Sequence, residues 1–170
     1  MQQESFMQFL QSPNRENFLA IRERIVESDV YDPYSAELMH AHTLIDQGRW
    51  QEARTLLTEA MPNLLLSPRA HSMLCFVVRE LGDAQGADAH RMIAAACCEG
   101  IASTGNGTRD APYLVLRTTD EYDIVQYFEK SVASQALIQE GDRTFDLIEC
   151  EDGTTFWFDV TDPFERAGPA

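Results

Sequence analysis

Basic residues are scarce in this sequence. Its 170 residues include 13 lysines and arginines against 28 aspartates and glutamates, which gives a formal net charge of −15, and Lys130 is the single lysine. Because such a chain repels a phosphate backbone, we do not expect it to bind nucleic acid. The acidity either keeps the protein soluble or attracts a basic protein partner, since exposed charge of one sign steers association.

Long apolar runs are also missing. None approaches the roughly 20 residues that a membrane-spanning helix needs. The first residues, MQQESFMQFLQSPNRE, do not combine a basic start with an apolar stretch as a signal peptide does. Hydrophobic residues nevertheless make up 44% of the chain, enough for a folded core. We therefore expect a folded cytoplasmic protein that does not associate with membranes.

Metal-binding motifs are absent as well. The four cysteines are Cys75, Cys97, Cys98 and Cys150. They form neither a CxxC pair nor a disulfide framework, and small buried thiols in a reducing compartment explain them. The four histidines are His40, His42, His71 and His90. No HExxH-type spacing occurs among them, although His40 and His71 could approach across neighbouring helices, so we predict no bound metal and no cofactor.

Catalytic motifs are equally scarce, and no GxSxG elbow for a nucleophilic serine occurs. Gly105 and Gly107, in TGNGT, lack the lysine of a phosphate-binding loop and form an incomplete dinucleotide fingerprint, so a tight turn between domains is the favoured interpretation. Asp120, Glu121 and Asp123 could form a cation site or an acid–base pair. Their place at a predicted helix start gives them an ordinary dipole role instead, and we predict no catalytic residue.

A 34-residue repeat stands out among the features that are present. Shifted by 34 residues, DQGRWQEA lies on ELGDAQGA, which aligns Gly48 with Gly82 and Ala53 with Ala87. Glycine readily adopts the left-handed conformation that ends a helix, and alanine lets two helix axes approach closely. The spacing therefore predicts two helical hairpins, each turning at its glycine.

The repeat resembles the tetratricopeptide repeat over about residues 33–100. The small residues Ala41 and Cys75, the two turn glycines and the aromatic Trp50 fall at positions typical of that family. The resemblance implies antiparallel helix pairs whose first helices line a concave groove for a protein partner. Transferred through the glycine alignment, the partner-binding positions are His42, Ile45, Asp46, Phe76, Arg79 and Glu80.

The sequence changes character after residue 100. The loop with Gly105, Gly107 and Pro112 predicts a boundary between a helical-repeat domain (1–99) and a small α+β domain (100–170). The elements expected beyond it are a strand at 113–118, a helix within 118–130, a strand at 135–139 and two strands about the turn at 152–153. This half is therefore predicted to be a β-α-β-β-β module.

Periodicity within this module predicts which side chains share a face. On its last strand, Phe156, Phe158 and Val160 share one face and Trp157 and Asp159 the other. On its helix, the residues expected on one apolar face are Tyr122, Val125 and Phe128.

The second half resembles an uncharacterised bacterial domain of unknown function over about residues 100–165. The motifs that carry the resemblance are TGNG, DEYD, SQALI, TFDLIE and FWFDVTDPF. The resemblance implies the fold, and no activity comes with it. The positions that it marks, with no role attached, are Gly105, Gly107, Tyr122, Asp146, Trp157, Asp159 and Phe164.

These observations lead to one fold prediction and two functional hypotheses. The fold is α+β: antiparallel, tetratricopeptide-like hairpins followed by the β-α-β-β-β module. The leading hypothesis is a non-enzymatic protein-interaction module that binds a basic partner, of the inhibitor or immunity type. The alternative is a small-ligand binder or enzyme with its site at the junction of the halves, where TGNGT meets the last hairpin.

Charge distribution makes the leading hypothesis more specific. Residues 101–170 carry 14 acids and 5 bases, a net of −9, against 14 acids and 8 bases, a net of −6, in residues 1–100. We therefore expect a basic partner to be drawn first to the second half. Asp120, Glu121 and Asp123 are the acids expected to steer it, in a salt-dependent manner.

Overall fold

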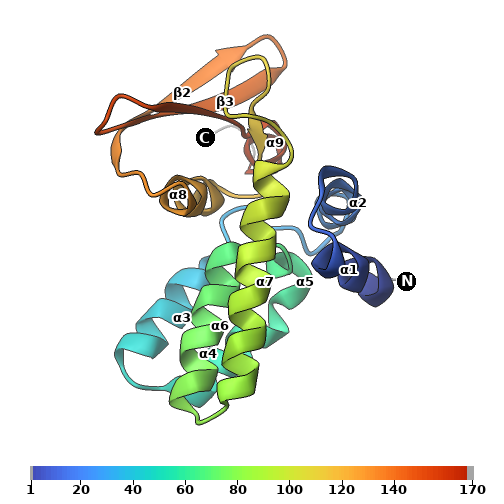
Figure 1. The fold of residues 1–170 in the computed structure, drawn as a ribbon, viewed down its shortest axis with the longest axis vertical. Coiled ribbons are helices and arrows are strands. Elements are labelled where there is room, and N and C mark those ends of the chain that lie inside the picture. Colours follow the sequence, from blue (N-terminus) through green and yellow to red (C-terminus); the bar gives the residue numbers. More distant parts are fainter. Residues whose placement is uncertain (1, 168–170) are drawn as a thin grey trace.

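The computed structural model describes residues 2–167, in which nine helices accompany one four-stranded sheet, so the predicted α+β class is confirmed. The helices are α1 (Gln2–Gln11), α2 (Arg15–Val26), α3 (Ala36–Asp46), α4 (Trp50–Glu59), α5 (Met61–Leu64), α6 (Pro68–Glu80), α7 (Ala84–Ala102), α8 (Thr118–Tyr127) and α9 (Thr161–Ala167). The strands are β1 (Tyr113–Leu114), β2 (Val132–Glu140), β3 (Arg143–Cys150) and β4 (Thr155–Asp159). Two helical hairpins form one end of the molecule, and the sheet lies at the other (Figure 1).

The hairpins turn where the sequence predicts. Gly48 separates α3 from α4 with φ of 71°, and Gly82 separates α6 from α7 with φ of 88°. The second helices of the two hairpins begin at Trp50 and Ala84, 34 residues apart. The prediction that these glycines end helices is confirmed, and the physical reason is the left-handed conformation that each supplies.

The conformation of Gly48 has a measurable consequence. Valine is strained at positive φ, so we expect Gly48→Val to lower the free energy of unfolding by about 1 kcal/mol or more. Gly48→Asn is the matched control, because asparagine tolerates this conformation, and it should lose less than about half as much. Urea denaturation measures both, and an unchanged midpoint for the valine variant would contradict the assignment.

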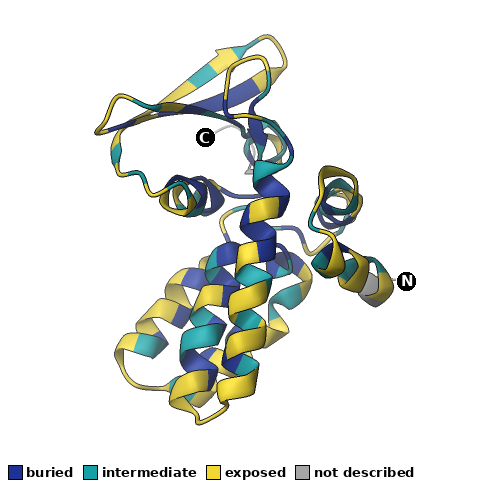
Figure 2. Cartoon of the chain, viewed as in Figure 1, coloured by how far each residue is buried: buried dark blue, intermediate teal, exposed yellow. Residues whose placement is uncertain are grey.

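Close contact between the hairpin helices depends on small side chains. Ala41 on α3 and Ala53 on α4 are fully buried, as is Ala70 on α6. Leu57 and Leu74 fill the space between them, and the outer faces of the helices are exposed (Figure 2). The alanines therefore let neighbouring helices approach, as the repeat spacing predicted.

The N-terminal helices join the core of the sheet half. Phe18, Ile21 and Ile25 form a buried stripe on α2, and they share one core cluster with residues of α7, β1, α8 and β4. Gly100, on the last turns of α7, lies so close to Phe18 and Phe9 that a Cβ would overlap their rings. The predicted boundary at residues 99 and 100 lies inside α7, which continues to Ala102.

The sheet has the order β1-β4-β3-β2, in which β1 and β4 are parallel and the other pairs antiparallel. The predicted β-α-β-β-β order is confirmed, although β1 is shorter and β2 longer than expected. Gly153, with φ of 82°, allows the tight turn between β3 and β4. Phe156, Phe158 and Val160 are buried, whereas Trp157 and Asp159 are partly exposed, as the strand alternation predicted.

Helix α8 packs against the inner face of this sheet in a different rotation from the predicted one. Val125 is buried, but Tyr122 is 40% exposed. The buried face of α8 comprises Asp120, Glu121, Ile124 and Val125. The apolar pattern alone misplaced this face, because two acids turn inward, Asp120 toward Arg117 at the start of the helix and Glu121 toward Gln135 on β2.

Candidate functional site

A groove runs between the hairpins and α8, and we call it the helical groove. Its volume is about 490 Å³. The residues that line it are His42, Ile45, Arg69, Ser72, Met73, Phe76, Asp123 and Gln126. Helices α3 and α6 form its floor, and the exposed end of α8 supplies the remaining wall.

Three of the six predicted partner-binding residues, His42, Ile45 and Phe76, lie together in this groove. The remaining three do not line it. Asp46 is exposed, with its carboxylate 3.5 Å from His42 Nε2. Arg79 and Glu80 are exposed at the end of α6, where the Arg79 guanidinium lies 5.8 Å from the centre of the Phe76 ring.

The contribution of α8 to the groove was missed by sequence reasoning. The Arg69 guanidinium on α6 donates two hydrogen bonds to Asp123 Oδ1 on α8, of 2.8 and 3.1 Å. A second hollow of about 370 Å³ shares Ser72, Asp123 and Gln126 with the helical groove and continues between α6, α7 and α8. The Arg69–Asp123 ion pair therefore connects α6 to α8, and side chains of α8 line both hollows.

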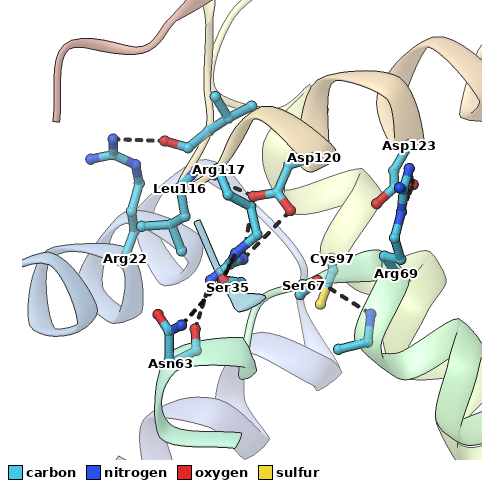
Figure 3. A network of polar contacts seen from close by, with 12 residues as sticks. Arg22, Ser35, Asn63, Ser67, Arg69, Cys97, Leu116, Arg117, Asp120 and Asp123 are labelled. Carbon is cyan, nitrogen blue, oxygen red and sulfur yellow. Dashed lines mark hydrogen bonds and ion pairs between the residues drawn. The ribbon is translucent and has the colours of Figure 1, made fainter. Parts of the chain in front are cut away.

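A network of polar contacts, which we call the polar junction, joins the two halves of the chain (Figure 3). Its centre is Arg117, whose side chain is fully buried. Arg117 donates a hydrogen bond of 2.7 Å to the Asn63 carbonyl and one of 3.1 Å to Ser35 Oγ, and it lies 3.4 Å from the Asp120 carboxylate. A single guanidinium thereby connects segments from both halves. Its several N–H groups can each donate to a different acceptor.

The two residues between β1 and Arg117 are hydrogen-bonded to side chains from the N-terminal part of the chain. The Tyr31 hydroxyl donates 2.7 Å to the Leu116 carbonyl, and Arg22 donates 3.1 Å to the Val115 carbonyl. Arg22 also pairs with Asp162 on α9 at 2.6 Å. The carbonyls of Val115 and Leu116, which follow β1, therefore accept hydrogen bonds from one side chain on α2 and one in the loop after it.

The three acids at the start of α8 do not have the predicted role. Asp120 and Glu121 are 1% and 0% exposed, and Asp123 is paired with Arg69. Burial raises the pKa of Asp120 to about 6, and the opposing charge of Arg117 limits the rise. The prediction of exposed steering charges is wrong here, because Asp120 is buried against Arg117, and Glu121 and Asp123 have partners on β2 and α6.

Glu121 and Asp146 form an acid pair on the inner face of the sheet. Burial and the neighbouring Asp146 raise the pKa of Glu121 to about 10, so at neutral pH Glu121 holds a proton that it shares with Asp146. Gln135 donates 2.8 Å to Asp146 Oδ2 and 3.3 Å to Glu121 Oε2, and the Tyr122 hydroxyl bonds to Gln135 in turn. Burial also raises the pKa of Asp146, and its hydrogen bonds with Gln135 and Glu121 limit the rise.

Asp146 also lines a cavity of about 160 Å³, which we call the inner cavity. The residues that line it are Pro33, Tyr34, Thr118, Leu137, Asp146, Val160, Pro163 and Phe164. They come from the loop before α3, the start of α8, strands β2 and β3, and the end of the chain from Val160 into α9. Sequence reasoning marked Asp146 and Phe164 separately, and the structure brings them together.

The predicted glycine loop is closely packed. The Gly107 carbonyl accepts a 2.9 Å hydrogen bond from the Trp157 amide, and a Cβ on Gly107 would press on the rings of Tyr113 and Phe156. A Cβ on Gly105 would overlap the carbonyl oxygens of Ala111 and Pro112. These glycines therefore serve close backbone packing.

Trp157 and Asp159 lie on the outer face of the sheet. Trp157 packs edge-on against Phe145, and the Arg109 guanidinium lies 6.0 Å from the centre of its ring. Asp159 accepts a 2.8 Å hydrogen bond from Arg143, which lies over Phe145. Both marked residues thus belong to a surface layer that covers the sheet.

The histidines pair differently from the prediction. His71 stacks on His90 with their Nδ1 atoms 3.2 Å apart, whereas His40 is exposed. Burial lowers the pKa of His71 to about 4, so its ring is neutral and packs in the hairpin interior. His40 and His71 were expected to approach because they lie near each other in the repeat alignment, but the stacked partner comes from α7.

Buried thiols account for most of the cysteines. All four are free, and Cys97, Cys98 and Cys150 are buried. Burial raises the pKa of Cys98 to about 12, which leaves it uncharged and unreactive at neutral pH. Within residues 2–167, no group of three or more histidine, cysteine or acidic side chains has an arrangement that could hold a metal ion.

Known families offer one match. The model of a family described as a domain of unknown function, DUF4919, matches residues 26–167. The chain belongs to this family. The match confirms the resemblance to an uncharacterised domain and extends it, since it covers both helical hairpins as well as the module after residue 100. No curated protein and no solved structure matches the chain.

The DUF4919 match covers the helical groove, the polar junction and the inner cavity. No helix in the described part of the chain has the length and apolar character to cross a bilayer. The residue that sequence reasoning missed most completely is Arg117, because nothing in its local sequence distinguishes a buried arginine from an exposed one.

Proposed function

We propose that the protein is a non-enzymatic protein-interaction module and that its helical groove binds a segment of a protein partner. The observation that carries this proposal is the convergence of His42, Ile45 and Phe76 in a groove walled by α8. On this proposal the hairpins act as tetratricopeptide-like units, which present their first helices to a partner. Helix α8 then closes the groove where a further unit would otherwise continue the array.

The side chains of the groove indicate the chemistry of the partner. Ile45, Met73 and Phe76 provide an apolar floor, and Asp123 is already neutralised by Arg69. Exposed acids lie nearby at Asp46, beside the groove, and at Glu80, at the end of α6. A segment with apolar anchors and basic flanks matches this arrangement and the net charge of −15. A basic toxin held by an acidic inhibitor or immunity protein is the narrower form of this proposal.

Substitution in the groove tests the proposal. Affinity capture from the native cell supplies the partner, and surface plasmon resonance with the purified pair measures the affinity. We expect Ile45→Arg and Met73→Arg each to weaken binding by about tenfold or more, because each puts a charge on the apolar floor. Met92→Arg is the matched control, since Met92 is 67% exposed on α7 and does not line the groove.

The role of charge is tested on the same pair of proteins. Asp46→Lys and Glu80→Lys should slow association several-fold at low salt and leave the dissociation rate nearly unchanged. If the two groove variants bind as tightly as the wild type, the groove is not the binding surface. A rate of association that is independent of ionic strength would mean that the acidity serves solubility alone.

A further inference from the structure

The inner cavity combines apolar walls with one acid. Tyr34, Leu137, Val160 and Phe164 are among the apolar side chains that line it, and the acid is Asp146, which is 3% exposed. Asp146 lies between Leu137 on β2 and Phe158 on β4 in the strand register. Positions on the buried face of a sheet are ordinarily apolar. Packing of the core therefore does not explain why a carboxylate lies here.

The acid pair has no counter-ion among the residues that the structure describes. The ion pairs of the described residues include neither Glu121 nor Asp146. The amide of Gln135 is the donor to the pair, and Glu121 Oε1 is buried with no donor N–H or O–H from another residue. Burial of a carboxylate without a cation is unfavourable, so a cation that enters the cavity gains free energy by pairing with it.

We propose that the inner cavity binds a small organic cation, an ammonium group carried on a compact apolar body, with Asp146 as its counter-ion. The apolar walls suit the body of such a ligand, and Tyr34, 72% exposed, presents an aromatic ring at the cavity. A volume of about 160 Å³ is below the roughly 300 Å³ of sites for drug-sized ligands, so the ligand is small.

Other classes of ligand fit less well. A hard metal ion takes about six oxygen ligands, whereas Asp146 is the single carboxylate among the residues that line the cavity. An anion would face a negative charge with no basic side chain in the lining. A neutral apolar molecule would leave the Asp146 carboxylate without a cation. The organic cation alone matches both the walls and the charge.

Calorimetric titration of the full chain tests this inference. The probes are benzylammonium, isobutylammonium and tetramethylammonium, with benzyl alcohol as the neutral analogue of the first. We expect saturable binding of at least one ammonium probe, with a dissociation constant below about 1 mM. Benzylammonium should bind at least about tenfold more tightly than benzyl alcohol, because only the ammonium group pairs with Asp146.

Two variants test whether the ammonium probes bind in the inner cavity. Asp146→Asn should weaken ammonium binding by at least about tenfold, and Glu149→Gln, an exposed acid on the same strand, is the matched control. Leu137→Arg puts a guanidinium beside Asp146 from the paired strand and should abolish binding. Because Leu137 is 58% exposed, this variant is expected to fold.

Three results would each overturn the inference. The first is equal affinity for benzylammonium and benzyl alcohol, which would show that the ammonium group contributes nothing to binding. The second is unchanged binding in both the Asp146→Asn and the Leu137→Arg variants. The third is the absence of saturable binding for all three ammonium probes up to about 10 mM.

Discussion

Arg117→Met is expected to lower the free energy of unfolding by about 3–5 kcal/mol. Arg117 is fully buried, and its removal leaves the Asp120 carboxylate buried without its cation. The Asn63 carbonyl and Ser35 Oγ also lose their donor. Methionine fills much of the space but offers no hydrogen bond, so the loss is mainly electrostatic.

Urea denaturation of the purified variants measures this effect, and a second substitution identifies its cause. Arg117→Met combined with Asp120→Asn should be more stable than Arg117→Met alone, because the unpaired charge is then absent. Arg91→Met is the matched control: the pair of Arg91 with Asp88 is exposed, with side chains 68% and 73% accessible, and its loss should not be measurable. A loss of less than about 1 kcal/mol for Arg117→Met would show that the junction does not depend on this arginine.

Glu121→Gln is expected to stabilise the protein at neutral and alkaline pH, by up to about 5 kcal/mol at about pH 8 where the glutamine packs as the protonated acid does. The pKa of Glu121 is raised from 4.5 to about 10 in the folded protein by burial and by Asp146. The folded state therefore keeps a proton that the unfolded state releases. Its contribution to stability is complete below about pH 4.5 and is lost progressively as the pH rises toward about 10.

The direction in which the free energy of unfolding changes with pH tests whether Glu121 is protonated in the folded state. Between about pH 7 and about pH 8, the wild type should lose about 1.4 kcal/mol more free energy of unfolding than Glu121→Gln, which corresponds to one proton. Comparison of the two proteins cancels the titration of the groups that do not interact with Glu121. Glu149→Gln removes an exposed carboxylate from β3 and should retain the wild-type slope. Parallel pH profiles for the wild type and Glu121→Gln would mean that Glu121 is ionised in the folded state.

Local sequence signals account for the parts of the fold that were predicted correctly. The helical hairpins follow from Gly48 and Gly82, whose positive φ angles any helix turn of this kind requires. The strand pair about Gly153 follows from a two-residue turn signal, and the alternation of Phe156 and Phe158 with Trp157 follows from strand geometry. Each of these features depends on residues a few positions apart.

The candidate sites depend on residues that are distant in the chain. The wall of the helical groove rests on Arg69 and Asp123, 54 residues apart, and the junction rests on Arg117 and Ser35, 82 residues apart. Three of the residues predicted to bind a partner line the groove, because the repeat alignment carries the orientation of α3 and α6. The alignment contains no information on α8, which comes from the other half of the chain.

Composition and local pattern determined the α+β class, the hairpin turns and the order of the strands, because backbone conformation follows from neighbouring residues. Tertiary structure alone decided the roles of Asp120, Glu121 and Asp123, which the sequence placed on an exposed helix end. Whether a carboxylate is exposed, ion-paired or protonated depends on the burial and the charges around it. The fold alone brings Asp146 and Arg69 to α8, and it buries Arg117, which the sequence already places three residues before Asp120.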